Sequence, residues 1–281
     1  FGGTYFNITV PEYREPGEWR QRQMKNKVKF ISGLYLILVL LFIMGPILVT
    51  VAFSFNLDRF SSLSWKGFTL QWYQRMFANK EIMQSLMNSL ILGVCVSLTS
   101  VLLGFTGAYG LRHWKSKLKV PFLLFSISPL MIPWTLLGLA LLIFFTRLGL
   151  PKSLFTVWIS HIVFTSPIAM TIINSRMETI PKSMENAAWD LGAGNIRTML
   201  YVILPQTIPA LVSAALMTFT ISFDEFIIAW FVCGFDKTLP VYIYSVIRSG
   251  VNPTINAIGT MVFMISLTLI AAAQMLQRKK A

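Results

Sequence analysis

Six long runs of apolar residues, separated by short polar segments, dominate the pattern of this chain. Each run is nearly free of charge and is close to or longer than the roughly 20 residues that an α-helix needs to cross the hydrocarbon core of a bilayer. Glycine and proline inside the runs are ordinary in membrane helices and predict kinks. We therefore expect six membrane-spanning helices, at residues 30–55, 85–111, 120–146, 153–175, 206–233 and 252–277.

The composition supports a membrane protein. Hydrophobic residues make up 55% of the 281 positions and charged residues only 12%, whereas soluble domains carry about 25% charged residues. A formal charge of +13 would suggest nucleic acid in a soluble chain. Here the basic residues flank the apolar runs instead of forming one polar face, so we expect no nucleic-acid partner.

The distribution of Lys and Arg predicts the orientation, because cytoplasmic loops of membrane proteins are enriched in both. Of the 24 Lys and Arg residues, 16 lie in alternate segments that include both ends of the chain. We therefore expect both termini in the cytoplasm. The predicted organisation is a cytoplasmic N-terminal segment, a six-helix transmembrane domain and a basic cytoplasmic tail, at residues 1–29, 30–277 and 278–281.

The loop at residues 176–205 is not basic like the other loops on its side, because it carries three basic and three acidic side chains. Its apolar residues, from Met184 to Leu200, recur at spacings of three and four, which predicts two short amphipathic helices. Gly192 and Gly194 between them are typical of a helix C-terminus and a turn. The pattern fits a helix in the lipid interface and a docking surface for a partner protein equally well.

Within this loop, Asn186-Ala187-Ala188 is followed by Gly192 and, twelve and thirteen residues after that glycine, by Leu204-Pro205. This spacing resembles the EAA loop of ABC importer permeases, the cytoplasmic coupling helix that docks on the ATPase. By this resemblance the ATPase-coupling residues are Glu185, Asn186, Ala187, Ala188, Asp190, Gly192, Leu204 and Pro205.

Two positions depart from the family motif. Asn186 stands where the motif has Glu, and Val202 stands where Ile is usual. Glu185 is adjacent to Asn186, but it lies about 100° away around a helix. The ionic contact of the motif's Glu therefore has no direct counterpart in the sequence.

Residues 222–260 resemble more specifically the second permease of spermidine and putrescine importers. The resemblance implies an all-α type I ABC importer permease fold that pairs with a second, homologous permease subunit, two ATPase subunits and a periplasmic substrate-binding protein. It also implies a polyamine or another small organic cation as the substrate. In the implied mechanism, closure of the ATPases moves the coupling helix, and the spans rock between outward and inward openings.

The chain lacks the GxxxxGK[ST] phosphate loop, the cradle of backbone amides and lysine that usually binds ATP. We therefore expect ATP and Mg on a partner ATPase, no cofactor in this chain and no enzymatic activity of its own. His113 and His161 show no metal-ligand spacing, and no catalytic set is suggested. His161 falls within a predicted span, where we expect a neutral ring hydrogen-bonded to a neighbouring helix, a functional role being the alternative.

Asp224 and Glu225 are the acidic residues that fall inside a predicted span. Asp224 lies 18 residues after Gln206, about 27 Å along a helix and close to the outer edge of a core about 30 Å thick. We predict a negative site at the outer mouth that favours a cationic solute, with simple exposure to interfacial water as the alternative. The predicted substrate path also includes aromatic residues that offer cation–π contacts, although an interfacial aromatic belt explains them as well: Trp230, Tyr242 and Tyr244.

Two outer segments and one further function stay open. The segments 56–84 and 238–250 fit either a landing surface for a binding protein or helices in the lipid interface. A secondary transporter or cation channel, in which Asp224 and Glu225 carry the coupling ion, is the alternative to an ABC permease. An intramembrane enzyme would need a catalytic pair that the spacing does not suggest.

Overall fold

The computed structural model describes residues 16–58, 65–249 and 253–278, and of residues 16–27, 249 and 269–278 only the backbone. In these ranges the regular elements are helices. The described residues also contain one isolated antiparallel bridge, between Asn56 and Phe68. The all-α prediction is therefore confirmed. The chain forms two compact units, Phe1–Ala52 and Phe53–Ala281, and α1 (Pro16–Phe53) supplies the described part of the first. The predicted N-terminal segment lies largely outside the described residues, as does most of the predicted tail.

The second unit contains the remaining helices. In chain order they are α2 (Gln71–Ala78), α3 (Lys80–His113), α4 (Lys119–Ile127), η1 (Ser128–Met131), α5 (Trp134–Arg147), α6 (Leu154–Glu178), α7 (Lys182–Asp190), α8 (Asn195–Thr198), η2 (Met199–Ile203), α9 (Leu204–Asp224), α10 (Ile227–Val232), α11 (Leu239–Ser249) and α12 (Thr254–Arg278).

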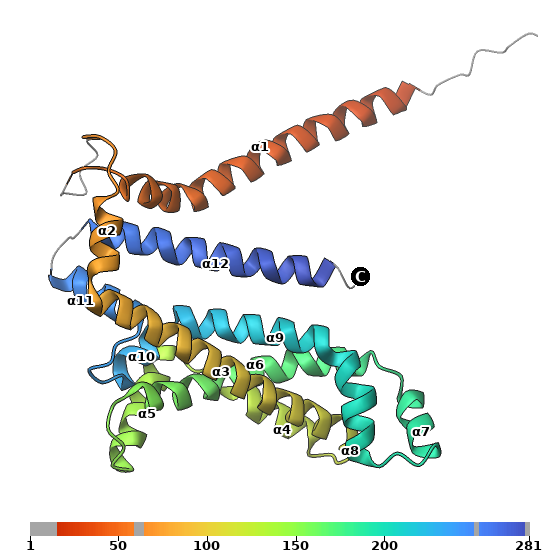
Figure 1. The fold of residues 1–281 in the computed structure, drawn as a ribbon. Helices are drawn as coiled ribbons and strands as arrows, with labels where there is room; N and C mark the ends of the chain where they lie inside the picture. The colour runs from red at the N-terminus through yellow and green to blue at the C-terminus, as the bar shows by residue number, and fades with distance from the viewer. Residues whose placement is uncertain (1–15, 59–64, 250–252, 279–281) are drawn as a thin grey trace, which may run out of the picture. The chain divides into compact units, whose positions relative to one another are not determined.

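The long helices α3, α6 and α9 pack against one another and form the centre of this unit (Figure 1). Their contacts use small residues and hydroxyl groups, which join helices in lipid through close packing and hydrogen bonds. Ser100 and Thr165 share a hydrogen bond of 2.7 Å between α3 and α6. Ser97 Oγ of α3 donates to the carbonyl of Ala215 in α9 at 2.8 Å. These polar groups are satisfied within the bundle rather than by water.

Gly104 sets the distance between α3 and α6. A Cβ atom added at this position would lie 2.7 Å from the backbone nitrogen of Met170 and 2.9 Å from Ala169. Because the nearest atom belongs to the backbone of the facing helix, no side chain can turn away to make room. The two helices can approach this closely only where residue 104 has no side chain.

The predicted number of six continuous spans is not confirmed. Four helices among the described residues are long and apolar enough to cross a membrane, and a fifth follows if α4–η1 and α5 count as one broken span. These two parts are bent by 100° at Ile132, which is extended, as expected of a residue before proline. The bend is sharper than the kink that we predicted within the span at 120–146, so the two parts form one broken span or a re-entrant loop.

The predicted span 206–233 is also divided. The helical stretch with span properties covers Asn195–Asp224, so it begins earlier and ends earlier than the apolar run suggests. Glu225 has an extended backbone with a ψ of 124°, and the following apolar residues form the separate short helix α10. That helix packs against α5 and α6.

The tight contact at Gly104 makes one stability prediction. Gly104→Val should force α3 and α6 apart and lower the free energy of unfolding by about 1–3 kcal/mol, the usual cost of overpacking. Gly110→Val is the matched control, because a Cβ at Gly110, in the same helix, meets nothing within 4 Å. Thermal unfolding of the purified protein in detergent measures the difference. Equal midpoints for the two variants would contradict the assignment of Gly104 to the helix contact.

Candidate functional site: the coupling loop and the buried carboxylates

The coupling loop, which we define as residues 176–205, lies at the end of the bundle where α6 ends and α9 begins (Figure 1). Helix α7 forms its first half and begins directly after Pro181. Asn186, Ala187 and Asp190 are exposed on this helix, Ala188 is half-buried and Glu185 is buried. The predicted coupling residues of α7 therefore fall on two faces, of which one points away from the bundle.

Gly192 ends α7 in the left-handed conformation, with a φ of +81°. The N–H of Gly192 donates to the carbonyl of Trp189 at 2.8 Å, and the N–H of Ala193 donates to the carbonyl of Ala188 at 2.9 Å. These two bonds form the Schellman motif, which satisfies carbonyls at a helix C-terminus and favours glycine at this position. The helix end predicted at Gly192 is confirmed.

Glu185 is the most connected residue of the loop. Its side chain is 3% exposed and forms an ion pair with Arg112, the penultimate residue of α3. The second carboxylate oxygen lies 2.7 Å from Nε2 of His113. Arg112 also donates to the carbonyl of Met177, in the last turn of α6, and to that of Ile180, two residues after α6 ends. A buried ion pair is acceptable only where such further hydrogen bonds satisfy the charged groups, and here the bonds join three elements.

The second half of the loop leads into the span through a π-helical turn. This turn, η2, directly precedes Leu204 and Pro205. Pro205 has no N–H group and cannot donate to the carbonyl of Tyr201 four residues earlier. The chain departs from the regular α-helical pattern at this point. Leu204 is half-buried and Pro205 is exposed. The Oη atom of Tyr109 in α3 donates to the carbonyl of Asn195 in α8 at 3.3 Å.

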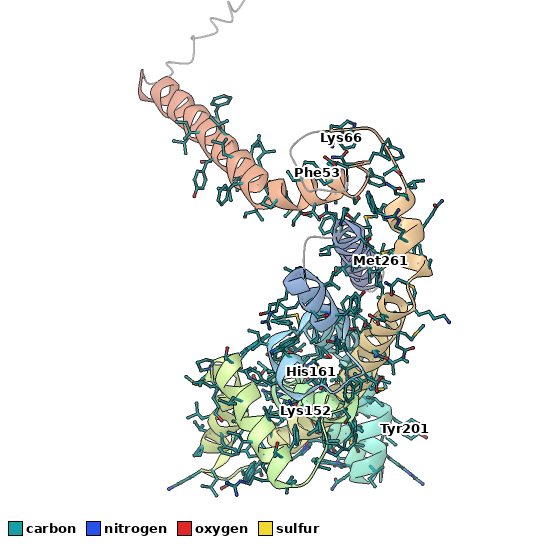
Figure 2. The ribbon with its side chains drawn as sticks, turned by 90° about the vertical axis from the view of Figure 1, so that its left-hand side faces the viewer. Phe53, Lys66, Lys152, His161, Tyr201 and Met261 are labelled. Carbon is teal, nitrogen blue, oxygen red and sulfur yellow. The ribbon has the colours of Figure 1, made fainter. Side chains whose placement is uncertain are left out.

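The coupling loop exposes several large apolar side chains. Leu191 is 89% exposed, Ile196 is 70% exposed and Tyr201 is 78% exposed. Tyr201, labelled in Figure 2, lies in η2 just before α9. Exposed apolar groups of this size are a common feature of surfaces that contact a protein or a membrane. The loop therefore combines a fixed inner face, at Glu185, with an apolar outer face.

The two adjacent carboxylates Asp224 and Glu225 have different environments. Asp224 is the last residue of α9 and is exposed. Glu225 is buried, and its two carboxylate oxygens accept hydrogen bonds from the N–H groups of Ile228 at 2.7 Å and Ala229 at 2.9 Å. It thus satisfies two donors that are free at the start of a helix. Glu225 therefore caps the N-terminus of α10. Asp224 is the accessible carboxylate of the pair.

His161 of α6 is fully buried and lies within the helical bundle (Figure 2). Its Nδ1 atom is 2.9 Å from the hydroxyl of Ser222 in α9, and its Nε2 atom is 3.2 Å from Glu225. The expected hydrogen bond to a neighbouring helix is therefore present. Together with Glu225, His161 connects α6 to the point where α9 ends and α10 begins.

The predicted aromatic residues divide into two groups. Trp230 and Tyr244 contact each other at 4.9 Å between ring centres, and the guanidinium of Arg248 lies 6.0 Å from the ring of Tyr244. Tyr242 is buried elsewhere, and desolvation raises its pKa, so its hydroxyl stays protonated. It lines a cavity of about 370 Å³ together with residues of both charges: Lys80, Glu81, Gln84, Ser85, Asn88, Phe235, Asp236 and Lys237.

Arg112 has a role in the structure that the sequence alone does not predict. In the sequence it is one of four basic side chains in the segment 112–119, which contribute to the predicted orientation. In the structure its side chain is 6% exposed and binds Glu185. A signal was present, because Arg112 directly follows an apolar run without a polar spacer, but the partner lies 73 residues away.

Comparisons with known proteins identify the family. Residues 100–280, more than half of the chain, match the family described as "Binding-protein-dependent transport system inner membrane component". The chain belongs to this family. It is therefore a membrane permease component of a transport system, and the predicted permease character is confirmed.

Among its relatives, the spermidine/putrescine transport system permease protein PotC of Haemophilus influenzae is 32% identical over 89% of this chain and 97% of the relative. The putrescine transport system permease protein PotI of Escherichia coli is 33% identical over 84% of this chain and 88% of the relative. A chain of a bacterial ABC transporter for the import of the acidic polysaccharide alginate has a similar fold, with a TM-score of 0.70, 17% identity and coverage of 96% and 99%.

The conformation of Gly192 makes a local prediction. Gly192→Val should destabilise the end of α7 by roughly 1–2 kcal/mol, because a side chain disfavours the left-handed conformation. Gly192→Asn is the matched control, since Asn adopts that conformation more readily than other side chains. A Cβ at this position meets nothing within 4 Å, so a steric clash does not contribute. We expect about tenfold faster amide hydrogen exchange at Ala193 in the Val variant, and equal exchange in both variants would refute this assignment.

Proposed function

We propose that this chain is one of the two permease subunits of an ATP-driven importer for a polyamine or another small organic cation. A second, homologous permease forms the other half of the path, and two ATPase subunits bind ATP and Mg. A periplasmic binding protein delivers the substrate. The coupling loop and both termini face the cytoplasm of a bacterial inner membrane.

The observation that carries this proposal is the geometry of the coupling loop. Its inner face is fixed to α3 and α6 by Glu185, while its outer face presents exposed apolar residues such as Leu191. The residues of the coupling motif, including Asn186 and Gly192, lie on or beside this outer face. Such a surface suits docking of a partner protein on a short helix. The polyamine class is supported by the names of the relatives that are 32% and 33% identical.

The mechanism is mechanical and needs no chemistry in this chain. Closure of the two ATPases displaces α7, which is joined to the ends of α3 and α6 through Arg112. The packed helices α3, α6 and α9 then move together relative to the partner permease. The path opens alternately to the two sides of the membrane.

Uptake by a reconstituted complex tests the function. Proteoliposomes that hold both permeases and the ATPase, with binding protein outside and ATP inside, should accumulate radiolabelled spermidine or putrescine. Uptake should be lost with an ATPase variant that cannot hydrolyse ATP and should persist when an uncoupler collapses the proton gradient. The reverse pattern would show a secondary transporter or channel. Uptake of a neutral or anionic solute alone would overturn the substrate class.

The accessible carboxylate Asp224 makes a second prediction within this function. Asp224→Asn should preserve assembly and lower uptake, and the loss should be greater for spermidine than for a monovalent amine. Each substrate charge interacts separately with the site, by about 1 kcal/mol at 4 Å in water, or roughly fivefold. Asp224→Glu keeps the charge and serves as the control. The measurement is the initial uptake rate at fixed ionic strength. Equal rates for the Asn and Glu variants would show that the charge of Asp224 does not contribute to uptake.

A further inference from the structure

The last two turns of α3 carry three side chains that all contact the coupling loop. Tyr109, Arg112 and His113 are spaced by three and four residues, so they share one face of the helix. Arg112 and His113 bind Glu185 in α7, and Tyr109 binds the backbone of Asn195 in α8. One helix end therefore holds both halves of the loop.

Arg112 has the largest number of connections in this group. Its guanidinium binds the carboxylate of Glu185 and the carbonyls of Met177 and Ile180, the last at 2.9 Å. The carbonyls at a helix C-terminus have no partner within the helix, so this side chain also completes the end of α6. Both partners of the ion pair are nearly excluded from solvent, where electrostatic hydrogen bonds are stronger than in water.

The backbone does not link α3 directly to the coupling loop. The coupling loop is covalently continuous with α6 and α9, whereas α3 ends 72 residues before Glu185. Displacement of the loop reaches α6 and α9 directly through the backbone. It reaches the cytoplasmic end of α3 through side chains, and the described polar links are those of Tyr109, Arg112 and His113.

We infer that Arg112 is a positioning residue for energy coupling, which locks α3 to the coupling loop so that movement of α7 drives α3 together with α6. The inference rests on the proposed function, because it assumes that α7 receives movement from an ATPase. Tyr109 provides a second, weaker link to the other half of the loop. Loss of the lock uncouples ATP hydrolysis from transport without removing the docking surface.

The test compares uptake with ATP hydrolysis in the same reconstituted complex. Arg112→Lys keeps the positive charge but cannot reach all three acceptors with one planar group. We expect assembly and ATP hydrolysis within about twofold of the wild type, while substrate transported per ATP falls at least about tenfold. Arg147→Lys, an exposed arginine at the end of α5, is the matched control and should leave the ratio unchanged.

A second variant keeps the test decisive where Arg112→Lys prevents assembly. Tyr109→Phe removes only the hydroxyl that binds Asn195, and we expect the transport-to-hydrolysis ratio to fall about twofold to fivefold. Tyr35→Phe, an exposed tyrosine of α1, is its control. A purely structural role would lower the amount of assembled complex but not the ratio for each complex.

The outcomes separate this inference from the proposed function. Wild-type complex without ATP-dependent uptake would overturn the proposed function itself. Wild-type uptake together with a normal ratio in Arg112→Lys would overturn only the role of Arg112. A normal ratio in Tyr109→Phe, when Arg112→Lys does not assemble, would likewise overturn the inference. A lowered ratio with retained hydrolysis supports it.

Discussion

Polar groups inside a membrane protein must find partners within the protein, because the surrounding hydrocarbon offers none. This constraint accounts for the main polar contacts of the bundle. The hydroxyls of Ser100 and Thr165 bond to each other across α3 and α6. The ring of His161 bonds to Ser222 and Glu225 across α6 and α9. These two contacts therefore join particular helices in a fixed register, which apolar packing alone would specify less strictly.

The same constraint applies to two pairs of consecutive polar residues, Glu185-Asn186 and Asp224-Glu225. In each pair one side chain is buried and the other is exposed. Consecutive residues of a helix point about 100° apart, so Glu185 faces the bundle while Asn186 faces outward. At the end of α9 the pair is divided by a break in the helix, which buries Glu225 and exposes Asp224. In both cases the buried carboxylate organises the backbone or a helix end. Its exposed neighbour is then free to contact another molecule.

The sequence predicts the local features of this structure better than the contacts between distant residues. The apolar runs locate the helices well, since length and lack of charge are local properties, and Gly192 marks a real helix end. The break at Pro133 is not visible as a gap in hydropathy, because apolar residues continue on both sides. At Asp224-Glu225 the sequence shows two charges inside an apolar run but does not show that the helix ends there. The ion pair of Arg112 with Glu185 joins residues far apart in the sequence. Such a pair depends on how α3 and α6 pack, and one sequence does not specify this packing.

Helix α3 is the element through which these local features become connected. It supplies residues to three hydrophobic clusters of the second unit, with Val96, Phe105 and Ile82 in one each. At about 1.5 Å per residue, its 34 residues extend about 51 Å. Arg112 holds the coupling loop at one end, while Asn88 and Ser89 bind the backbone of Lys237 and Leu239 towards the other. One continuous helix therefore connects the coupling loop at Arg112 to the segment that lines the cavity at Tyr242, and in the proposed mechanism a shift of α3 would reach both.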